Sequence, residues 1–127
     1  MLFIDNDGTI FIYQGDSGEI VVNGLNENTS YKVYFSIQDE KRNQIGEELQ
    51  ISASDTSMVT FVLSSAYTDN LTVPLNKPYK IYYYGIKVCI EGDSTEDTLF
   101  IANSSYGDLN KIIVYPRKVK GTANGSV

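Results

Sequence analysis

The run Tyr-Lys-Ile-Tyr-Tyr-Tyr-Gly-Ile-Lys-Val-Cys-Ile, residues 79–90, limits the possible folds more than any other part of the chain. Tyr, Ile and Val suit a pleated, packed surface, so the run predicts a β-strand rather than a membrane helix, for which it is also too short. Side chains alternate between the two faces of a strand, and here both faces carry apolar residues. We therefore predict a central strand that is covered on at least one side. Gly85 in its middle predicts a bulge or the close approach of another backbone.

Shorter stretches of the same kind recur along the chain at roughly ten-residue spacing, with turn residues between them. The predicted strands are residues 2–4, 9–13, 19–23, 31–39, 48–52, 58–63, 98–102 and 111–115. The first two are expected to form a hairpin around an Asp-Asn-Asp-Gly turn. The one place for a helical turn is residues 64–71, which Ser64 could cap. This pattern predicts an all-β sandwich or barrel.

The chain has 127 residues, which is the size of one domain and enough to bury a core without disulfide or metal support. We predict a β-sandwich domain over residues 1–116, followed by a flexible tail over residues 117–127. The tail begins with a small basic cluster, Arg117, Lys118 and Lys120, which we interpret as a solvated or subunit-docking segment.

Several residue types that would carry chemistry are missing. The chain has no His, which removes the commonest general base and metal ligand, and no Trp, a frequent platform for stacking sugars and bases. Its net charge of -6 argues against a nucleic-acid partner. The single Cys89 lies in a strand pattern and is predicted to be a small core residue rather than a nucleophile. Because the sequence shows no disulfide framework and no signal peptide, we expect synthesis in a reducing cytoplasm. We expect neither a membrane partner nor a cofactor.

Residues 2–10, Leu-Phe-Ile-Asp-Asn-Asp-Gly-Thr-Ile, resemble the first motif of haloacid-dehalogenase-type phosphatases. The resemblance implies a nucleophile at Asp5 and a general acid/base at Asp7, with Mg²⁺ offsetting the carboxylate and phosphate charges. Residues 92–97, Gly-Asp-Ser-Thr-Glu-Asp, resemble the late metal-binding motif of the same family. However, that family has a parallel sheet with crossover helices, whereas this chain continues into another strand at once. Asp and Gly are also the ordinary residues of β-turns. We therefore interpret both acidic segments as solvated turns, in preference to a phosphatase active site or a Ca²⁺ site in the same loops.

From Gln14 onward, the pattern of strands resembles the N-terminal β-sandwich module of tailed-phage baseplate upper proteins and related virion proteins. The stretches that carry the resemblance are residues 14–20, 31–39, 59–64, 79–88 and 97–100. It implies an immunoglobulin-like antiparallel β-sandwich of about eight short strands. It also implies a non-enzymatic structural part of a virion, made in the cytoplasm of the host bacterium, such as a capsid decoration, head fibre or baseplate adaptor. Partners would be other coat, tail or fibre proteins, and the chain itself as a homo-oligomer. Baseplate upper proteins continue into a long C-terminal region, whereas this sequence ends in a short tail, so we expect a free-standing decoration, adaptor or fibre-base protein rather than a complete host-recognition device.

The candidate interaction surface consists of the tyrosines predicted to face outward, together with the basic cluster: Tyr34, Tyr82, Tyr84, Arg117, Lys118 and Lys120. Tyrosine suits such a surface because it has an apolar ring and a polar tip. The same tyrosines could instead pack with the ring inside and the hydroxyl at the surface. The alternative function is a carbohydrate- or receptor-binding adhesin module that uses Tyr82 and Tyr84.

Overall fold

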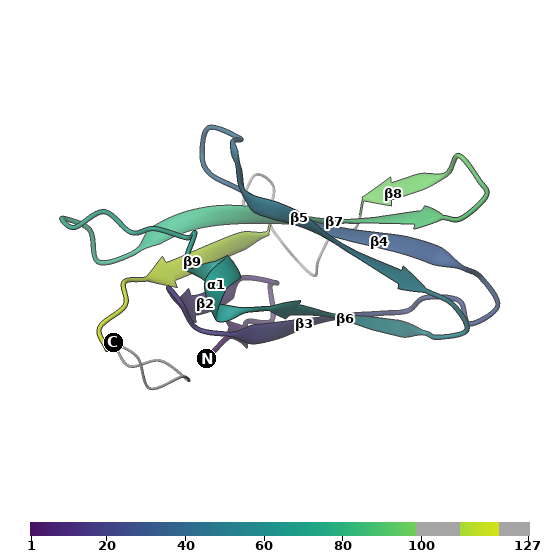
Figure 1. Cartoon of the computed structure of the whole chain (residues 1–127), viewed down its shortest axis with the longest axis horizontal. Helices are drawn as coiled ribbons and strands as arrows, with labels where there is room; N and C mark the ends of the chain where they lie inside the picture. Colours follow the sequence, from purple (N-terminus) through teal and green to yellow (C-terminus); the bar gives the residue numbers. More distant parts are fainter. Residues whose placement is uncertain (99–109, 120–127) are drawn as a thin grey trace.

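The computed structural model describes residues 1–98 and 110–119. Within these residues the chain forms nine strands and one short helix, which confirms the predicted all-β class. The strands form two layers that pack face to face as a sandwich (Figure 1). In the described part of the chain, no helix is long and apolar enough to cross a membrane.

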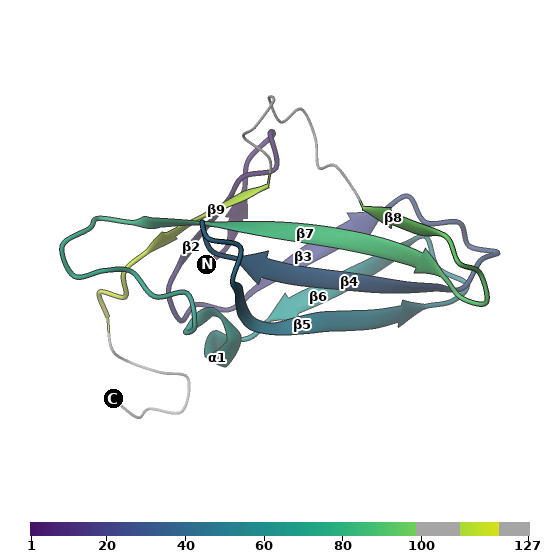
Figure 2. The same cartoon turned by 90° about the horizontal axis from the view of Figure 1, so that it is seen from above.

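The larger layer is a seven-stranded sheet. Its order is β1 (Phe3–Ile4), β2 (Ile10–Tyr13), β9 (Lys111–Tyr115), β7 (Lys80–Ile90), β4 (Tyr31–Gln38) and β5 (Gln44–Ala53), with β8 (Glu96–Thr98) also paired to β7. Figure 2 shows β7, β4 and β5 lying side by side. The predicted antiparallel pairing was wrong for one pair, because β2 and β9 run parallel. These two strands are far apart in sequence, so no tight turn forces them to run in opposite directions.

The smaller layer is a two-stranded antiparallel sheet of β3 (Gly18–Asn23) and β6 (Met58–Leu63), which are separated in sequence by β4 and β5. The helix α1 (Ser65–Thr68) follows β6 and covers one end of the sandwich (Figure 1). The predicted cap is confirmed, since the Ser64 hydroxyl accepts a 3.1 Å hydrogen bond from the backbone N–H of Tyr67. The predicted β1–β2 hairpin is confirmed as well.

The core lies between the two layers and follows the alternation expected of strands with one covered face. Val33, Phe35 and Ile37 of β4 are fully buried, and so are Phe61 and Leu63, which share one face of β6. The Phe35 ring packs 5.7 Å from the rings of both Phe61 and Tyr84, measured between centroids. Aromatic side chains from both layers therefore meet at the centre of the sandwich.

The strand β7 is the longest element. It pairs with β4 along one edge and with β9 and β8 along the other, which confirms the predicted central strand. The predicted bulge at Gly85 was wrong, because Gly85 pairs with Ser36 within an unbroken register. The irregularity lies instead between β4 and β5, where Phe35 pairs with Leu49 but Ile37 pairs with Ile45. The extra residues are in β5, around Gly46, whose φ of 72° favours glycine.

Two predicted boundaries shift for related reasons. The strand β5 begins at Gln44, four residues before the predicted start at residue 48, because pairing with β4 overrides the polar composition of this segment. The strand β8 begins at Glu96, inside a predicted acidic turn. Most of the strand predicted at 98–102 lies outside the described residues.

Candidate functional site

The outer face of the larger sheet, which points away from the core, is the candidate interaction surface. On β7 the even-numbered side chains from Tyr82 to Val88 are buried, so the odd-numbered ones point outward. On β4 the order is reversed, and Tyr34, Ser36 and Gln38 point outward. The register joins these two sets into rows, because Gln38 lies opposite Tyr83 and Tyr34 lies opposite Lys87.

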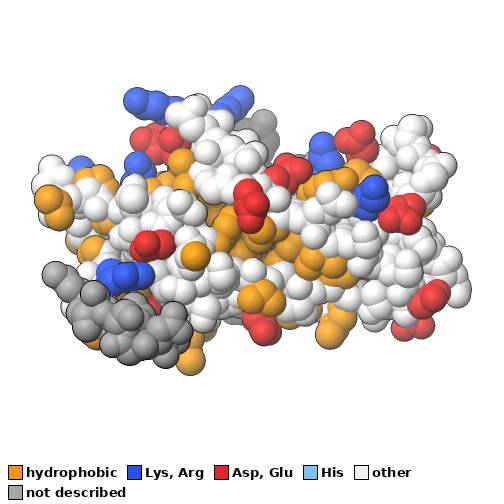
Figure 3. Space-filling model, viewed as in Figure 1, with side chains coloured by type: hydrophobic (Ala, Val, Ile, Leu, Met, Phe, Trp, Pro, Cys, Tyr) orange, Lys and Arg blue, Asp and Glu red, His pale blue; other side chains and the backbone are white. Residues whose placement is uncertain are grey.

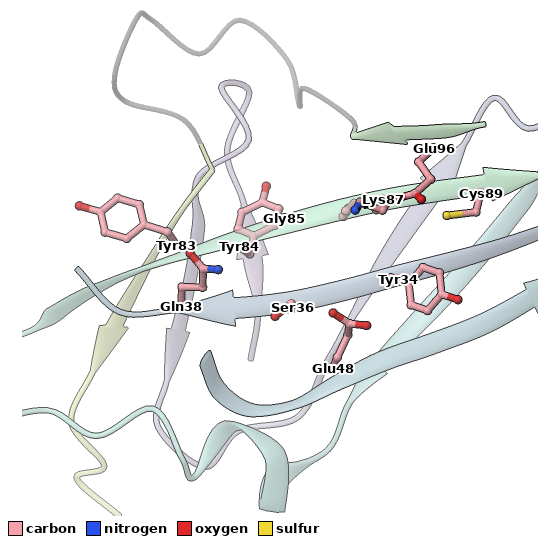
Figure 4. Close-up of a pocket in the computed structure, with 11 residues that line it drawn as sticks. Tyr34, Ser36, Gln38, Glu48, Tyr83, Tyr84, Gly85, Lys87, Cys89 and Glu96 are labelled. Carbon is pink, nitrogen blue, oxygen red and sulfur yellow. Dashed lines mark hydrogen bonds and ion pairs between the residues drawn. The ribbon is translucent and has the colours of Figure 1, made fainter. Parts of the chain in front are cut away.

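A shallow hollow of about 530 Å³ lies on this face. Its floor is the pair Ser36 and Gly85, which lie opposite each other on adjacent strands. A Cβ atom built on Gly85 would meet nothing within 4 Å, so the space above the glycine is open. Figure 4 shows that the lining side chains come from the adjacent strands β5, β4, β7 and β8.

The charges around the hollow are partly balanced. Lys87 Nζ donates a 3.1 Å hydrogen bond to Glu96 Oε1. This contact, together with the carboxylate charge, raises the pKa of Lys87 above its ordinary value. Glu48 also lines the hollow and has no ion-pair partner among the described residues. Elsewhere, Figure 3 shows basic and acidic side chains interspersed over the viewed side of the molecule.

The assignment of Tyr82 and Tyr84 to an exposed surface was wrong. Tyr82 is 1% exposed and Tyr84 is 6% exposed, because both lie on the covered face of β7. Their hydroxyls donate 2.5 Å hydrogen bonds to backbone carbonyl oxygens, of Thr72 and Gly8 respectively. Most buried tyrosine hydroxyls have such a partner. Of the three predicted tyrosines, only Tyr34 contributes to the outer face, where it is half-buried.

The predicted basic cluster is described in part, as Arg117 and Lys118. The guanidinium of Arg117 lies against Gly15 and makes a 3.2 Å ion pair with Asp69. Arg117 therefore attaches the chain after β9 to the body of the sandwich, rather than opening the predicted flexible tail. Lys118 is exposed, and Lys120 lies outside the described residues.

The predicted acidic motifs form turns. Asp5 and Asp7 lie exposed in the turn between β1 and β2, where Asp7 Oδ1 accepts a 3.0 Å hydrogen bond from the N–H of Thr9. This contact lowers the pKa of Asp7 below its ordinary value. In the second motif, Asp93 Oδ1 accepts a 3.2 Å bond from the N–H of Thr95. Nowhere in residues 1–98 and 110–119 do three or more His, Cys, Asp or Glu side chains come together in a way that could hold a metal ion.

Cys89 does not lie in the core, as the sequence predicted. It is half-buried on the outer face of β7, opposite Lys32 on one side and Glu96 on the other. The prediction failed because it placed Cys89 by its type rather than by its position in the alternation.

Sequence reasoning missed the most apolar part of the outer face, which we call the aromatic row. It runs across four adjacent strands, where each residue lies opposite the next: Phe3, Phe11, Ile113 and Ile81. A parallel row beside it contains Tyr13 and Tyr115, whose ring centroids are 5.4 Å apart. Phe3 is 62% exposed and Tyr13 is 42% exposed. The signal was present in the alternation of β2, but the sequence did not show which of its two apolar faces was covered.

Comparisons with known proteins show likeness at the level of the fold. No protein-family model matches the sequence, and no curated protein is significantly similar to it. Among solved structures, the crystal structure of the periplasmic chaperone SfaE superposes with a TM-score of 0.62 at 11% sequence identity. The match covers 91% of this chain and 57% of the chaperone chain, so this chain spans little more than half of its length. The chain therefore has an immunoglobulin-like β-sandwich fold.

Proposed function

We propose that the chain is a non-enzymatic structural module that assembles through protein–protein contacts of its aromatic row. The observation that carries this proposal is the exposure of large apolar side chains in one continuous strip of the outer face. Phe3 and Tyr13 are well exposed, and Phe11, Ile113 and Ile81 are half-buried beside them. Contiguous apolar patches of this kind mark interaction sites, and the centres of protein interfaces are rich in Phe and Tyr.

The surroundings of the row extend the strip. Tyr79, the residue before β7, is 45% exposed. It lines a second hollow of about 510 Å³, whose other lining residues include Pro74, Pro78, Ile81 and Tyr83. An interface that covers the row would thus also fill this hollow. Well-packed pockets near an interface centre are where single side chains contribute most to binding.

The setting that we propose for this assembly is a phage particle. The support for it is the resemblance of the strand pattern to baseplate sandwich modules, together with the lack of histidine in the chain. We do not propose the chaperone role of SfaE for this chain, because a structural match at 11% sequence identity shows only a shared fold.

Light scattering after size-exclusion chromatography tests the assembly itself. We expect a symmetric oligomer, which Phe3→Ser combined with Tyr13→Ser shifts to the monomer. A matched control is Val62→Ser on the smaller layer, because Val62 and Phe3 are both 62% exposed. A monomer at all concentrations, or dissociation by Val62→Ser and not by the double variant, would contradict the proposed surface.

Mass spectrometry of purified particles tests the setting. The chain should be found in particles of a phage that carries its gene, in a fixed ratio to the coat or tail proteins. Its presence in infected cells combined with its absence from the particles would contradict a virion role while leaving the assembly surface standing.

A further inference from the structure

The hollow over Ser36 and Gly85 is separate from the aromatic row and has a different chemistry. Its walls are two half-buried tyrosines, and polar side chains lie around them. Tyr83 stands beside Gly85 at one end of the hollow, and Tyr34 stands beside Ser36 at the other. Both tyrosines are held by strands, so their positions are fixed before any ligand arrives.

The distance between the two walls limits what the hollow can hold. Tyr34 lies opposite Lys87, which is four residues from Tyr83 along β7. At about 3.4 Å per residue along the strand and about 4.8 Å between strands, the two tyrosines leave their strands about 14 Å apart. An aromatic cage for a cationic group needs its rings within about 6 Å of the charge, so these tyrosines cannot form one. Two ring-stacking positions at the ends of a shallow trough instead suit a short, flat chain of sugar rings.

The polar groups are also those that sugar hydroxyls require. The Ser36 hydroxyl, the Gln38 amide and the Glu48 carboxylate line the hollow and supply both donors and acceptors. The ammonium of Lys87 is engaged by Glu96, so the unbalanced charge at the hollow is the carboxylate of Glu48. That charge repels anionic sugars and accepts hydrogen bonds from neutral ones.

From this geometry we propose that the hollow over Ser36 and Gly85 binds a neutral oligosaccharide, which stacks on Tyr34 and Tyr83 and bonds to Ser36, Gln38 and Glu48. This binding site uses none of the residues of the aromatic row. It shares Tyr83 with the second hollow beside that row, whereas Tyr34 and Gly85 line the sugar site alone. Substitutions at Tyr34 and Gly85 therefore test the sugar site without changing the proposed assembly surface.

Isothermal titration calorimetry with the neutral tetrasaccharides maltotetraose, cellotetraose, lacto-N-tetraose and tetraacetylchitotetraose, which are long enough to reach both tyrosines, tests the site, with sialyllactose as an anionic probe. The decisive variant is Gly85→Val, which fills the hollow. A side chain at Gly85 meets open space, and Val suits a strand, so this variant should fold at least as well as the original chain. Thermal unfolding of the variant checks this point.

We expect at least one neutral probe to bind, and Gly85→Val to weaken its binding by about ten-fold or more, a loss of about 1.4 kcal/mol. Tyr34→Ala should weaken it similarly, because Tyr34 lines this hollow and not the second one, whereas Tyr13→Ala, an exposed tyrosine elsewhere on the same sheet, should leave it unchanged. The proposal is overturned if none of the neutral probes binds, if the folded Gly85→Val variant keeps full affinity, or if sialyllactose binds more tightly than the neutral sugars.

Discussion

The hydroxyl of Tyr84 donates a 2.5 Å hydrogen bond to the backbone carbonyl oxygen of Gly8, 76 residues earlier in the chain. The bond joins the central strand β7 to the turn between β1 and β2, at the edge of the larger sheet. Tyr84 and Gly8 are both buried, so water cannot replace either partner. This contact fixes the end of the hairpin whose strands carry Phe3 and Phe11 of the aromatic row.

Replacing Tyr84 with Phe should destabilise the protein by about 1–3 kcal/mol, because the buried carbonyl of Gly8 loses its hydrogen-bond donor while the ring still fills the core. Urea denaturation at neutral pH measures this change in the free energy of unfolding. The control is Tyr79→Phe, which removes a hydroxyl from a residue that is 45% exposed and should change stability little. Equal effects of the two substitutions would show that the hydrogen bond does not matter.

The buried tyrosines also predict how stability changes in alkali. Burial raises the pKa of Tyr84 and of Tyr67 from 10.0 to about 12, with smaller contributions from Asp7 and Glu47. Because both pKa values are higher in the folded chain, the stability they confer is complete below pH 10 and is lost as the pH rises towards 12. Denaturation curves across this range should show the loss. It should be smaller in Tyr84→Phe, and an unchanged pH dependence in that variant would contradict the assignment to Tyr84.

A second polar contact in the core attaches α1 to the turn between β2 and β3. The side chain of Thr68 is fully buried, and its hydroxyl donates a 2.6 Å hydrogen bond to the backbone carbonyl of Asp16. Thr68→Val keeps the shape and removes the donor, so we expect a loss of about 1–3 kcal/mol in urea denaturation. Thr60→Val, on the outer side of the smaller layer, is the matched control and should be close to neutral.

The sequence allowed the covered faces of β4 and β6 to be predicted, because their apolar residues alternate with polar ones. In β4, for example, Val33 and Phe35 alternate with Lys32 and Tyr34, and the structure buries the first pair and not the second. Such an alternation can be seen in the sequence because the buried positions and the outward positions carry residues of different types. The same reasoning found the Ser64 cap, where one side chain accepts from the backbone of its own helix.

The covered face of β7 could not be predicted from the sequence in this way, because the strand has tyrosine on both faces. Tyr82 and Tyr83 are identical in type, yet one is buried and the other lines the hollow. What distinguishes them is the hydrogen bond from the Tyr82 hydroxyl to Thr72, a contact with a loop that no local pattern reveals. The hollow itself arises because Ser36 and Gly85 lie opposite each other, which depends on the register between two strands. The parallel pairing of β2 with β9 completes the aromatic row in the same non-local manner.

The turn between β4 and β5 offers a substitution that should increase stability. Its Asp39 carboxylate accepts bonds from the N–H groups of Lys41 and Asn43, each 2.9 Å long, and these contacts lower the pKa of Asp39. Within this turn Arg42 has a φ of 65°, a left-handed conformation that costs a residue with a Cβ atom about 1–2 kcal/mol relative to glycine.

Arg42→Gly should therefore stabilise the protein by up to about 1 kcal/mol, because the relief of the left-handed conformation exceeds the extra freedom that glycine gives to the unfolded chain. Lys41→Gly is the control, since Lys41 does not have a positive φ and glycine there only adds freedom to the unfolded chain. We expect thermal unfolding to show a rise in Tm for Arg42→Gly and a fall for Lys41→Gly. A fall in both would show that the turn does not keep Arg42 in this conformation in solution.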